Sequence, residues 1–191
     1  MKNSILTLII FTLSIISCQA QTISLETMAQ CSINPESCPD VTYIKDINNS
    51  LNKYVGIWKG NFNGKTYEFK FIKQLNFGVE DDFRWDRLIG RIRIKDGNGA
   101  ILYNTFNEID DNNTKFKGDN FQPDLEAYKV YFVGNSACVE YGDVYLRIYP
   151  STPNQMTVFF HPDNDISEEG SCPPDFQPTI PYQKTIHLTK Q

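Results

Sequence analysis

The stretch YVGIWKG (Tyr54–Gly60) decides the fold that this chain is expected to adopt. From here to the C-terminus, short runs rich in aromatic and β-branched residues follow one another. Glycine tolerates backbone angles that other residues avoid, so Gly56 lets a strand bend, and the large ring of Trp58 suits a buried position. We therefore expect this stretch to be the first strand of a small antiparallel β-barrel, with Trp58 closing the barrel floor.

The residues after Gly60 alternate between apolar and polar side chains. The period is two, as in strands with one buried face, and it is clearest in Lys65–Lys73 and in Leu88–Lys95. Asn63-Gly64 and Asp96–Gly99 have the composition of hairpin turns. The segment Leu75–Trp85 lacks a regular period and is expected to be an irregular connection.

The rest of the chain predicts more strands of the same kind. They are expected over Ala100–Asn107, Thr114–Lys117, Ala127–Val133, Asp143–Tyr149, Gln155–His161 and Lys184–Thr189. Hairpin-type spacing favours a meander, and closing a meander removes its exposed edges. The sequence predicts an all-β fold: a single antiparallel up-and-down, lipocalin-like β-barrel of about eight to nine strands.

Composition limits the function classes. The chain has 191 residues, 13% aromatic residues and a formal net charge of −5. This length suits one domain with its own core, and the acidic balance argues against a nucleic-acid partner.

The N-terminus has the features of an export signal. Lys2 precedes an apolar run, Ile5–Ile16, that is too short to cross a bilayer but suits a secretory signal. The run ends at Ser17-Cys18, which looks like a bacterial lipobox; cleavage after Ala20 is the alternative. We expect residues 1–17 to be a lipoprotein signal peptide and Cys18 to be the lipid anchor. The protein would then face the periplasm of a bacterial cell envelope, with the anchor as its only membrane contact.

The other four cysteines indicate disulfides. Cys31, Cys38, Cys138 and Cys172 allow three connectivities in an oxidising compartment. We expect Cys31–Cys38 and Cys138–Cys172; zinc is disfavoured because no Cys-x-x-Cys pair is present. Residues 18–52 would then be a tether and disulfide-pinned leader, with a short helical lead-in over Val41–Asn52, and residues 53–191 the barrel domain.

Gly56-Ile57-Trp58 resembles the Gly-x-Trp signature of lipocalins and fatty-acid-binding barrels. The resemblance implies that Trp58 packs across the closed end beneath a basic residue of a late strand, here Arg147 or Lys184. The whole chain also resembles small lipoproteins of Bacteroidota that form a family of unknown function. The leader from Lys2 to Cys18, Lys53–Trp58 and Asp86–Gly90 carry that resemblance, which implies location and a lipocalin-like fold but no activity.

One strand offers a candidate ligand-binding face. Tyr145, Arg147 and Tyr149 alternate with Val144, Leu146 and Ile148, so a guanidinium and two phenols share one side of the strand. If that side faces inwards, it suits the carboxylate of a ligand. If the aliphatic side faces inwards, as is more usual for a core, Arg147 lies on the surface. The sequence leaves both orientations open.

No catalytic constellation can be assembled from the sequence. It contains no Gly-x-Ser-x-Gly elbow, Gly-rich phosphate loop or His-Glu-x-x-His, so we expect no enzyme, no cofactor and no metal. Asp163-Asn164-Asp165, followed by Glu168 and Glu169, lacks the spacing of a calcium loop. The expected function is binding of a small apolar or amphipathic ligand inside the barrel, with Trp58 beside the binding face. The alternative is an interaction protein with a filled barrel and a protein partner.

Overall fold

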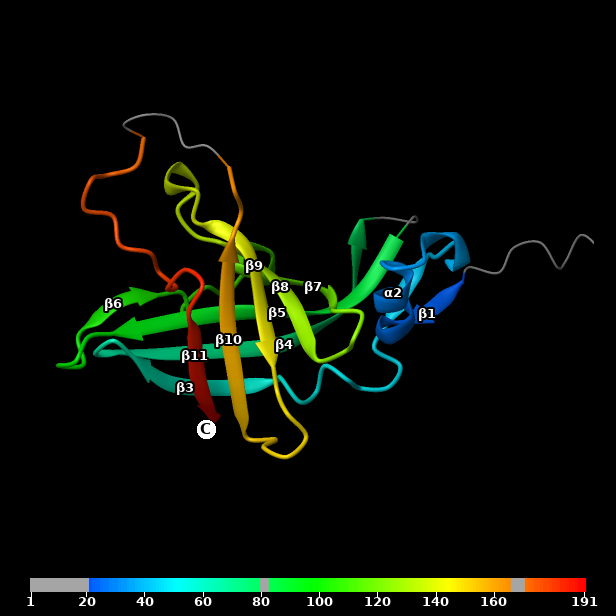
Figure 1. The fold of residues 1–191 in the computed structure, drawn as a ribbon, viewed down its shortest axis with the longest axis horizontal. Coiled ribbons are helices and arrows are strands. Elements are labelled where there is room, and N and C mark those ends of the chain that lie inside the picture. Colours follow the sequence, from blue (N-terminus) through cyan, green and yellow to red (C-terminus); the bar gives the residue numbers. More distant parts are fainter. Residues whose placement is uncertain (1–20, 80–82, 166–170) are drawn as a thin grey trace, which may run out of the picture.

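The computed structural model describes residues 21–79, 83–165 and 171–191; the predicted signal peptide and Cys18 lie outside these residues. Eight antiparallel strands close a barrel (Figure 1). They are β3 (Gly56–Phe62), β4 (Lys65–Val79), β5 (Phe83–Lys95), β7 (Phe116–Phe121), β8 (Ala127–Val133), β9 (Tyr141–Arg147), β10 (Gln155–Pro162) and β11 (Thr185–Lys190). Each pairs with the next, and β11 returns to β3. The expected up-and-down barrel is confirmed.

The strand β6 (Ile101–Asn104) lies off this path and extends one end of β5, while β5 pairs with β7 to close the barrel. Two strands are longer than expected. The prediction that Leu75–Trp85 is irregular is wrong, because β4 and β5 stay paired as far as Val79 and Phe83. A register shift between Gln74 and Phe77 interrupts the alternation there, and such a bulge hides the period from the sequence.

The barrel interior is filled by aromatic rings. The ring centroids of Phe116 and Phe132 lie 4.7 Å apart, and Phe160 meets Phe132 edge-on at 5.5 Å. Phe71 meets Phe116 at 6.1 Å, and all four side chains are fully buried. Gly90 makes room for this packing, because a Cβ atom there would lie 2.6 Å from the Phe71 ring. These aromatic contacts occupy the centre of the barrel.

Trp58 closes one part of this core. It is fully buried, and its Nε1 donates to the carbonyl of Tyr54 at 2.7 Å. The basic residue over its ring is Lys190, with Nζ 5.2 Å from the centroid. The expectation of Arg147 or Lys184 is wrong because β11 pairs with β3 so that Lys190 stands opposite Trp58.

The leader is folded onto the barrel. It forms β1 (Thr22–Ser24), helix α2 (Leu25–Cys31), a 3₁₀ turn (Pro35–Ser37) and β2 (Tyr43–Lys45). Figure 1 shows α2 and β1 at the end of the barrel away from β6. Leu25 and Ala29 are fully buried in the same core as the barrel residues. None of the helices in the described ranges is long and apolar enough to span a membrane.

The prediction of a helical lead-in over Val41–Asn52 is wrong. This segment contains β2, which pairs in parallel with β1 and with the start of β5. The helix comes earlier, where the Ser24 hydroxyl accepts from the Thr27 N–H and caps its first turn. Two more 3₁₀ turns, Asp111–Asn113 and Ser136–Cys138, complete the helical content of the described residues.

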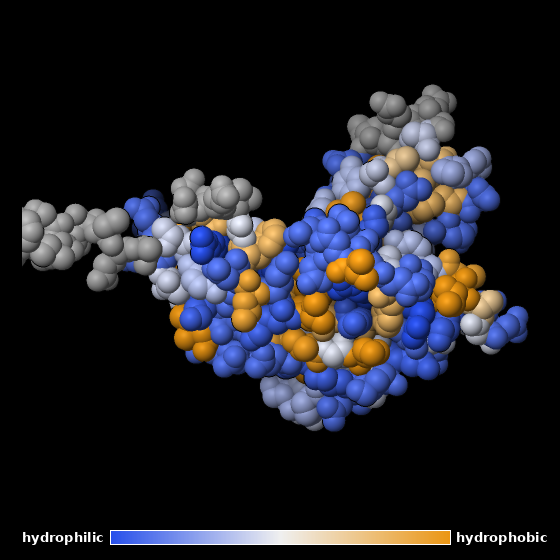
Figure 2. Space-filling model, turned by 180° about the vertical axis from the view of Figure 1, so that it is seen from behind, coloured by the Kyte–Doolittle hydropathy of each residue, from blue (hydrophilic) through white to orange (hydrophobic). Residues whose placement is uncertain are grey.

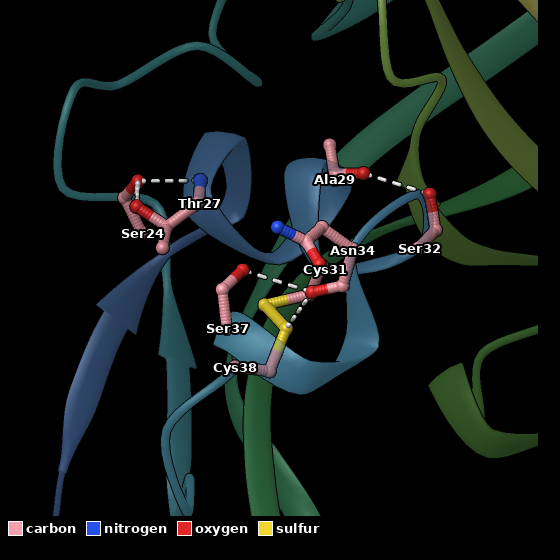
Figure 3. Close-up of a disulfide and its surroundings, with 8 residues drawn as sticks. All are labelled: Ser24, Thr27, Ala29, Cys31, Ser32, Asn34, Ser37 and Cys38. Atoms are coloured by element: carbon pink, nitrogen blue, oxygen red, sulfur yellow. Dashed lines mark hydrogen bonds between the residues drawn. A yellow bond between two sulfur atoms is a disulfide. The ribbon is translucent and has the colours of Figure 1, made fainter.

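Both disulfides have the expected pairing. Cys31 is joined to Cys38 and Cys138 to Cys172. Figure 3 shows the first of these beside Asn34, whose carbonyl accepts from the Ser37 hydroxyl at 2.9 Å. The first closes the leader loop after α2, and the second ties the segment before β11 to the turn between β8 and β9.

A buried carboxylate fixes the leader to the barrel. Asp86 is 2% exposed and accepts from the Tyr43 hydroxyl at 2.6 Å, the Asp46 N–H at 3.0 Å and the Asn76 N–H at 2.9 Å. The Asp46 carboxylate in turn meets Lys73 Nζ at 2.8 Å. Because unpartnered buried groups are costly, this network holds β2 in place.

The contact between Tyr43 and Asp86 predicts a pH dependence of stability. Desolvation, and then the hydrogen bond to Asp86, raises the pKa of Tyr43 to about 12, whereas an unfolded tyrosine titrates near ~10. Since the folded pKa is the higher one, the stability from the neutral phenol is complete below about pH 10 and is lost as pH rises through about 12.

We expect Tyr43→Phe to lower the free energy of unfolding by about 1–2 kcal/mol near neutral pH. The difference between wild type and variant should shrink between about pH 10 and pH 12, as urea unfolding of both proteins at a series of pH values would show. If the difference in unfolding free energy stays constant across this range, the pKa of Tyr43 is not raised by its contact with Asp86.

Candidate functional site

The face of β9 that carries Arg147 points away from the barrel interior. Val144 and Leu146 are fully buried, and Ile148, just after the strand, is 6% exposed. Tyr145 and Arg147 are half-buried and Tyr149 is 49% exposed on the other side. Of the two orientations that the sequence allows, the structure has the aliphatic side inwards. Trp58 is fully buried in the core and is therefore not part of the same surface, so the prediction that it lies beside the binding face is wrong.

Three adjacent strands place side chains from different parts of the chain around one hollow. In the register of the sheet, Thr157 of β10 stands between Arg147 of β9 and His187 of β11. Phe159 stands in the same way between Tyr145 and Thr185. We call this surface the outer groove. It has a volume of about 620 Å³ and is lined by Gln122, Tyr145, Arg147, Tyr149, Thr157, Phe159, His161, Thr185 and His187.

The lining of the outer groove contains no acidic residue, although the protein as a whole is acidic. The net charge of the chain is −5, yet every residue that lines the groove is neutral or basic. Arg147 Nη2 lies 3.3 Å from the carboxylate of Glu126, whose side chain is 56% exposed and is not among those that line the groove. The hydrogen bond that Arg147 donates to the Tyr149 hydroxyl, at 3.5 Å, raises the pKa of the guanidinium. The side chain is charged at neutral pH, as arginine is in general.

The groove combines aromatic and hydroxyl groups. The rings of Tyr145 and Phe159 have centroids 6.5 Å apart and form part of its floor. Partial burial raises the pKa of the Tyr145 phenol, which therefore remains a hydrogen-bond donor at neutral pH. Such a surface can pack an apolar face of a ligand and bond its polar edge.

The sequence identified one of the three strands of this groove. Tyr145, Arg147 and Tyr149 lie together on it, as their alternation indicates. Phe159, His161 and His187 were not predicted as binding residues. Their strands alternate with the same period, which could have placed them on outer faces, but the register that brings them beside β9 has no signal in one sequence.

The acidic turn after β10 is held by tyrosines. Asp163 accepts from the Tyr131 hydroxyl at 2.6 Å and Asp165 from the Tyr141 hydroxyl at 2.7 Å. The hydrogen bond that Tyr131 donates to Asp163 raises the pKa of the Tyr131 phenol to about 12. Glu168 and Glu169 lie outside the described residues. Within the described ranges, no three His, Cys, Asp or Glu residues come together to hold a metal ion.

The side of the molecule seen from behind the view of Figure 1 has hydrophobic residues on its surface. Figure 2 shows hydrophobic residues there in several separate clusters among hydrophilic ones. The most exposed large apolar side chain of the described residues is Ile109, at 95%, and Ile101 and Leu102 of β6 are 58% and 53% exposed.

Comparisons with known proteins place the chain in a family. A search of the curated proteins and a search of the solved structures found no match. A family model matches residues 1–160, which is most of the chain. The chain therefore belongs to a family of unknown function (DUF6705).

Proposed function

We propose that this chain is a non-catalytic binding protein that holds an anionic, amphipathic molecule in the outer groove. The observation that carries the proposal is the groove lining: aromatic, hydroxyl, imidazole and guanidinium groups without a carboxylate, on a protein of net charge −5. Its volume of about 620 Å³ lies within the usual range for ligand sites.

The filled barrel favours a site outside the barrel over one inside it. A ligand carried inside would need a void of roughly 300 Å³ or more. In this barrel, Phe132 and its ring neighbours are fully buried and contact one another at the centre. Ligand binding therefore stays a proposal, and we place its site in the outer groove instead of the barrel interior that the sequence suggested.

Arg147 is the residue proposed to pair with the anion. A guanidinium has five N–H donors, and the contacts with Glu126 and Tyr149 leave others free for a carboxylate. The pair with Glu126 is exposed, and such pairs contribute about 1 kcal/mol or less, so a ligand can compete with it.

Arg147→Met keeps much of the bulk of the side chain and removes its charge. We expect it to weaken binding of glucuronate, a small ring with one carboxylate, by about tenfold, since a charge-assisted hydrogen bond contributes about 1.5 kcal/mol or more. Isothermal titration of both proteins with glucuronate and with its methyl ester measures this. The methyl ester should bind both proteins equally.

The matched control is Lys59→Met, which removes a charge from an exposed position on β3 outside the groove. It should leave glucuronate binding unchanged. If wild-type protein binds neither the acid nor the ester, the proposed function is wrong.

We also propose that the mature protein is anchored to a bacterial membrane through a lipid on Cys18. The motif Leu13–Cys18 supports this. Full-length protein should then sediment with the membrane fraction, and Cys18→Ala should release it or block its processing, as fractionation and N-terminal analysis would show. A soluble mature chain that begins at Gln21 would contradict the anchor.

A protein partner is the second candidate function. The filled interior and the exposed large apolar side chains of β6 and Ile109 favour it, because exposed apolar surface is what a protein partner would cover.

A further inference from the structure

The outer groove belongs to a row of three adjoining hollows on the surface, of which it is the first. It also shares Arg147, Tyr149, Thr157 and His187 with a separate hollow of about 380 Å³ over β9, β10 and β11. The second hollow of the row, of about 400 Å³, shares Gln122 and Tyr145 with the outer groove and lies over β7, β8 and helix α2. A third, of about 390 Å³, shares Met28 and Ser32 with the second and runs beside the Cys31–Cys38 disulfide. We call the three hollows together the track.

The track is long. From β11 to β7 it crosses five neighbouring strands, which at about 4.8 Å per strand spacing is roughly 19 Å along the sheet. It then continues past α2 to Phe83 at the start of β5. A single small ring fills one hollow of this track, whereas a chain of rings could follow all three.

The charges along the track are uneven. Arg147 supplies the positive charge of the first hollow. In the second hollow, Lys129 Nζ lies 2.8 Å from the Asp119 carboxylate and 3.3 Å from the Asp143 carboxylate. Two carboxylates therefore offset its charge, whereas Arg147 meets one. Asp40 is the charged residue in the third. This pattern suits a ligand with a carboxylate at one end and a neutral, polar remainder.

In the track, side chains and not main-chain groups would contact a ligand. Each strand beneath the first hollow is paired on both sides: β9 with β8 and β10, and β11 with β10 and β3. An extended peptide therefore cannot add to the sheet as a further strand there, and would lose the main-chain hydrogen bonds that usually hold it. Aromatic faces with hydroxyl, amide and imidazole groups instead match sugar rings, which have apolar faces and hydroxyl edges.

From these observations we infer that the ligand is an oligosaccharide of several mostly neutral sugar rings that carries a carboxylate near one end. The acidic ring lies in the outer groove beside Arg147, and the neutral rings run over Tyr145 and Gln122 towards Met28 and Ser32. This inference rests on the proposed function of the outer groove.

The test is a length series. The probes are glucuronate and xylo-oligosaccharides of two to six rings that carry one glucuronic acid, measured by isothermal titration with the same protein. We expect glucuronate to bind weakly and affinity to rise about tenfold or more by four to five rings. Ser32 is exposed, and Ser32→Trp should obstruct the passage between the second and third hollows. It should remove the gain from the longest probes and leave glucuronate binding unchanged.

Asn98→Trp adds the same ring to the exposed turn between β5 and β6, at the opposite end of β5 from Phe83, and should change neither result. If glucuronate binds and affinity does not rise with length, the inference is wrong while the proposed function stands. If no probe binds, both are wrong. If an oligoglutamate of equal length binds as tightly as the glycan, the ligand is a peptide and the inference is overturned.

Discussion

Phe132→Ala is expected to lower the free energy of unfolding by about 3–5 kcal/mol, because it removes a fully buried ring and leaves a cavity. Phe132 lies between Phe116 and Phe160, so both neighbours lose a ring contact. Urea unfolding followed by circular dichroism measures the change.

The control is Phe159→Ala, on β10 next to Phe160, whose side chain faces the outer groove instead of the interior. It should cost about 1 kcal/mol or less. If Phe132→Ala costs no more than this control, the interior is loosely packed, and a ligand inside the barrel becomes the better account.

Loss of the Cys138–Cys172 disulfide should have an effect of similar size. The bond joins residues 34 positions apart, and the chain-entropy model gives about 4 kcal/mol for such a loop. Cys138→Ser/Cys172→Ser should therefore unfold at much lower urea concentration. The segment should stay docked in part, because Glu140 still accepts from the Thr179 hydroxyl and Ile180 remains in the core.

The matched comparison is Cys31→Ser/Cys38→Ser, whose bond joins residues only 7 apart and is expected to contribute about 2.5 kcal/mol. Comparing the loss of unfolding free energy in the two double variants tests the explanation by chain entropy. If the short loop costs more than the long one, chain entropy does not determine the stability gained from these bonds.

Alternation within a strand was enough to predict most of the barrel. Lys65–Lys73 and Ala127–Val133 have one face of aromatic or aliphatic residues, and in the structure those faces are inside. The sequence failed where the period was broken or short. The bulge after Gln74 hid the length of β4, and a seven-residue helix between a cap and nearby prolines gave too few turns to recognise.

Contacts between strands were less predictable than the strands themselves. Lys190 reaches Trp58 because of the register between β11 and β3, and the sequence offered Arg147 and Lys184 as equally good partners. The outer groove shows the same limit. Arg147 and its two tyrosines could be found from one strand, but the addition of His187 and Phe159 depends on how three strands pair.

The most direct test of where the ligand binds is a nuclear magnetic resonance titration of the folded protein with glucuronate. We expect chemical-shift changes at Arg147, Tyr145, Thr157 and His187, with the resonances of the interior rings of Phe116, Phe132 and Phe160 unchanged. Changes centred on those interior rings, with the outer groove silent, would contradict binding in the outer groove.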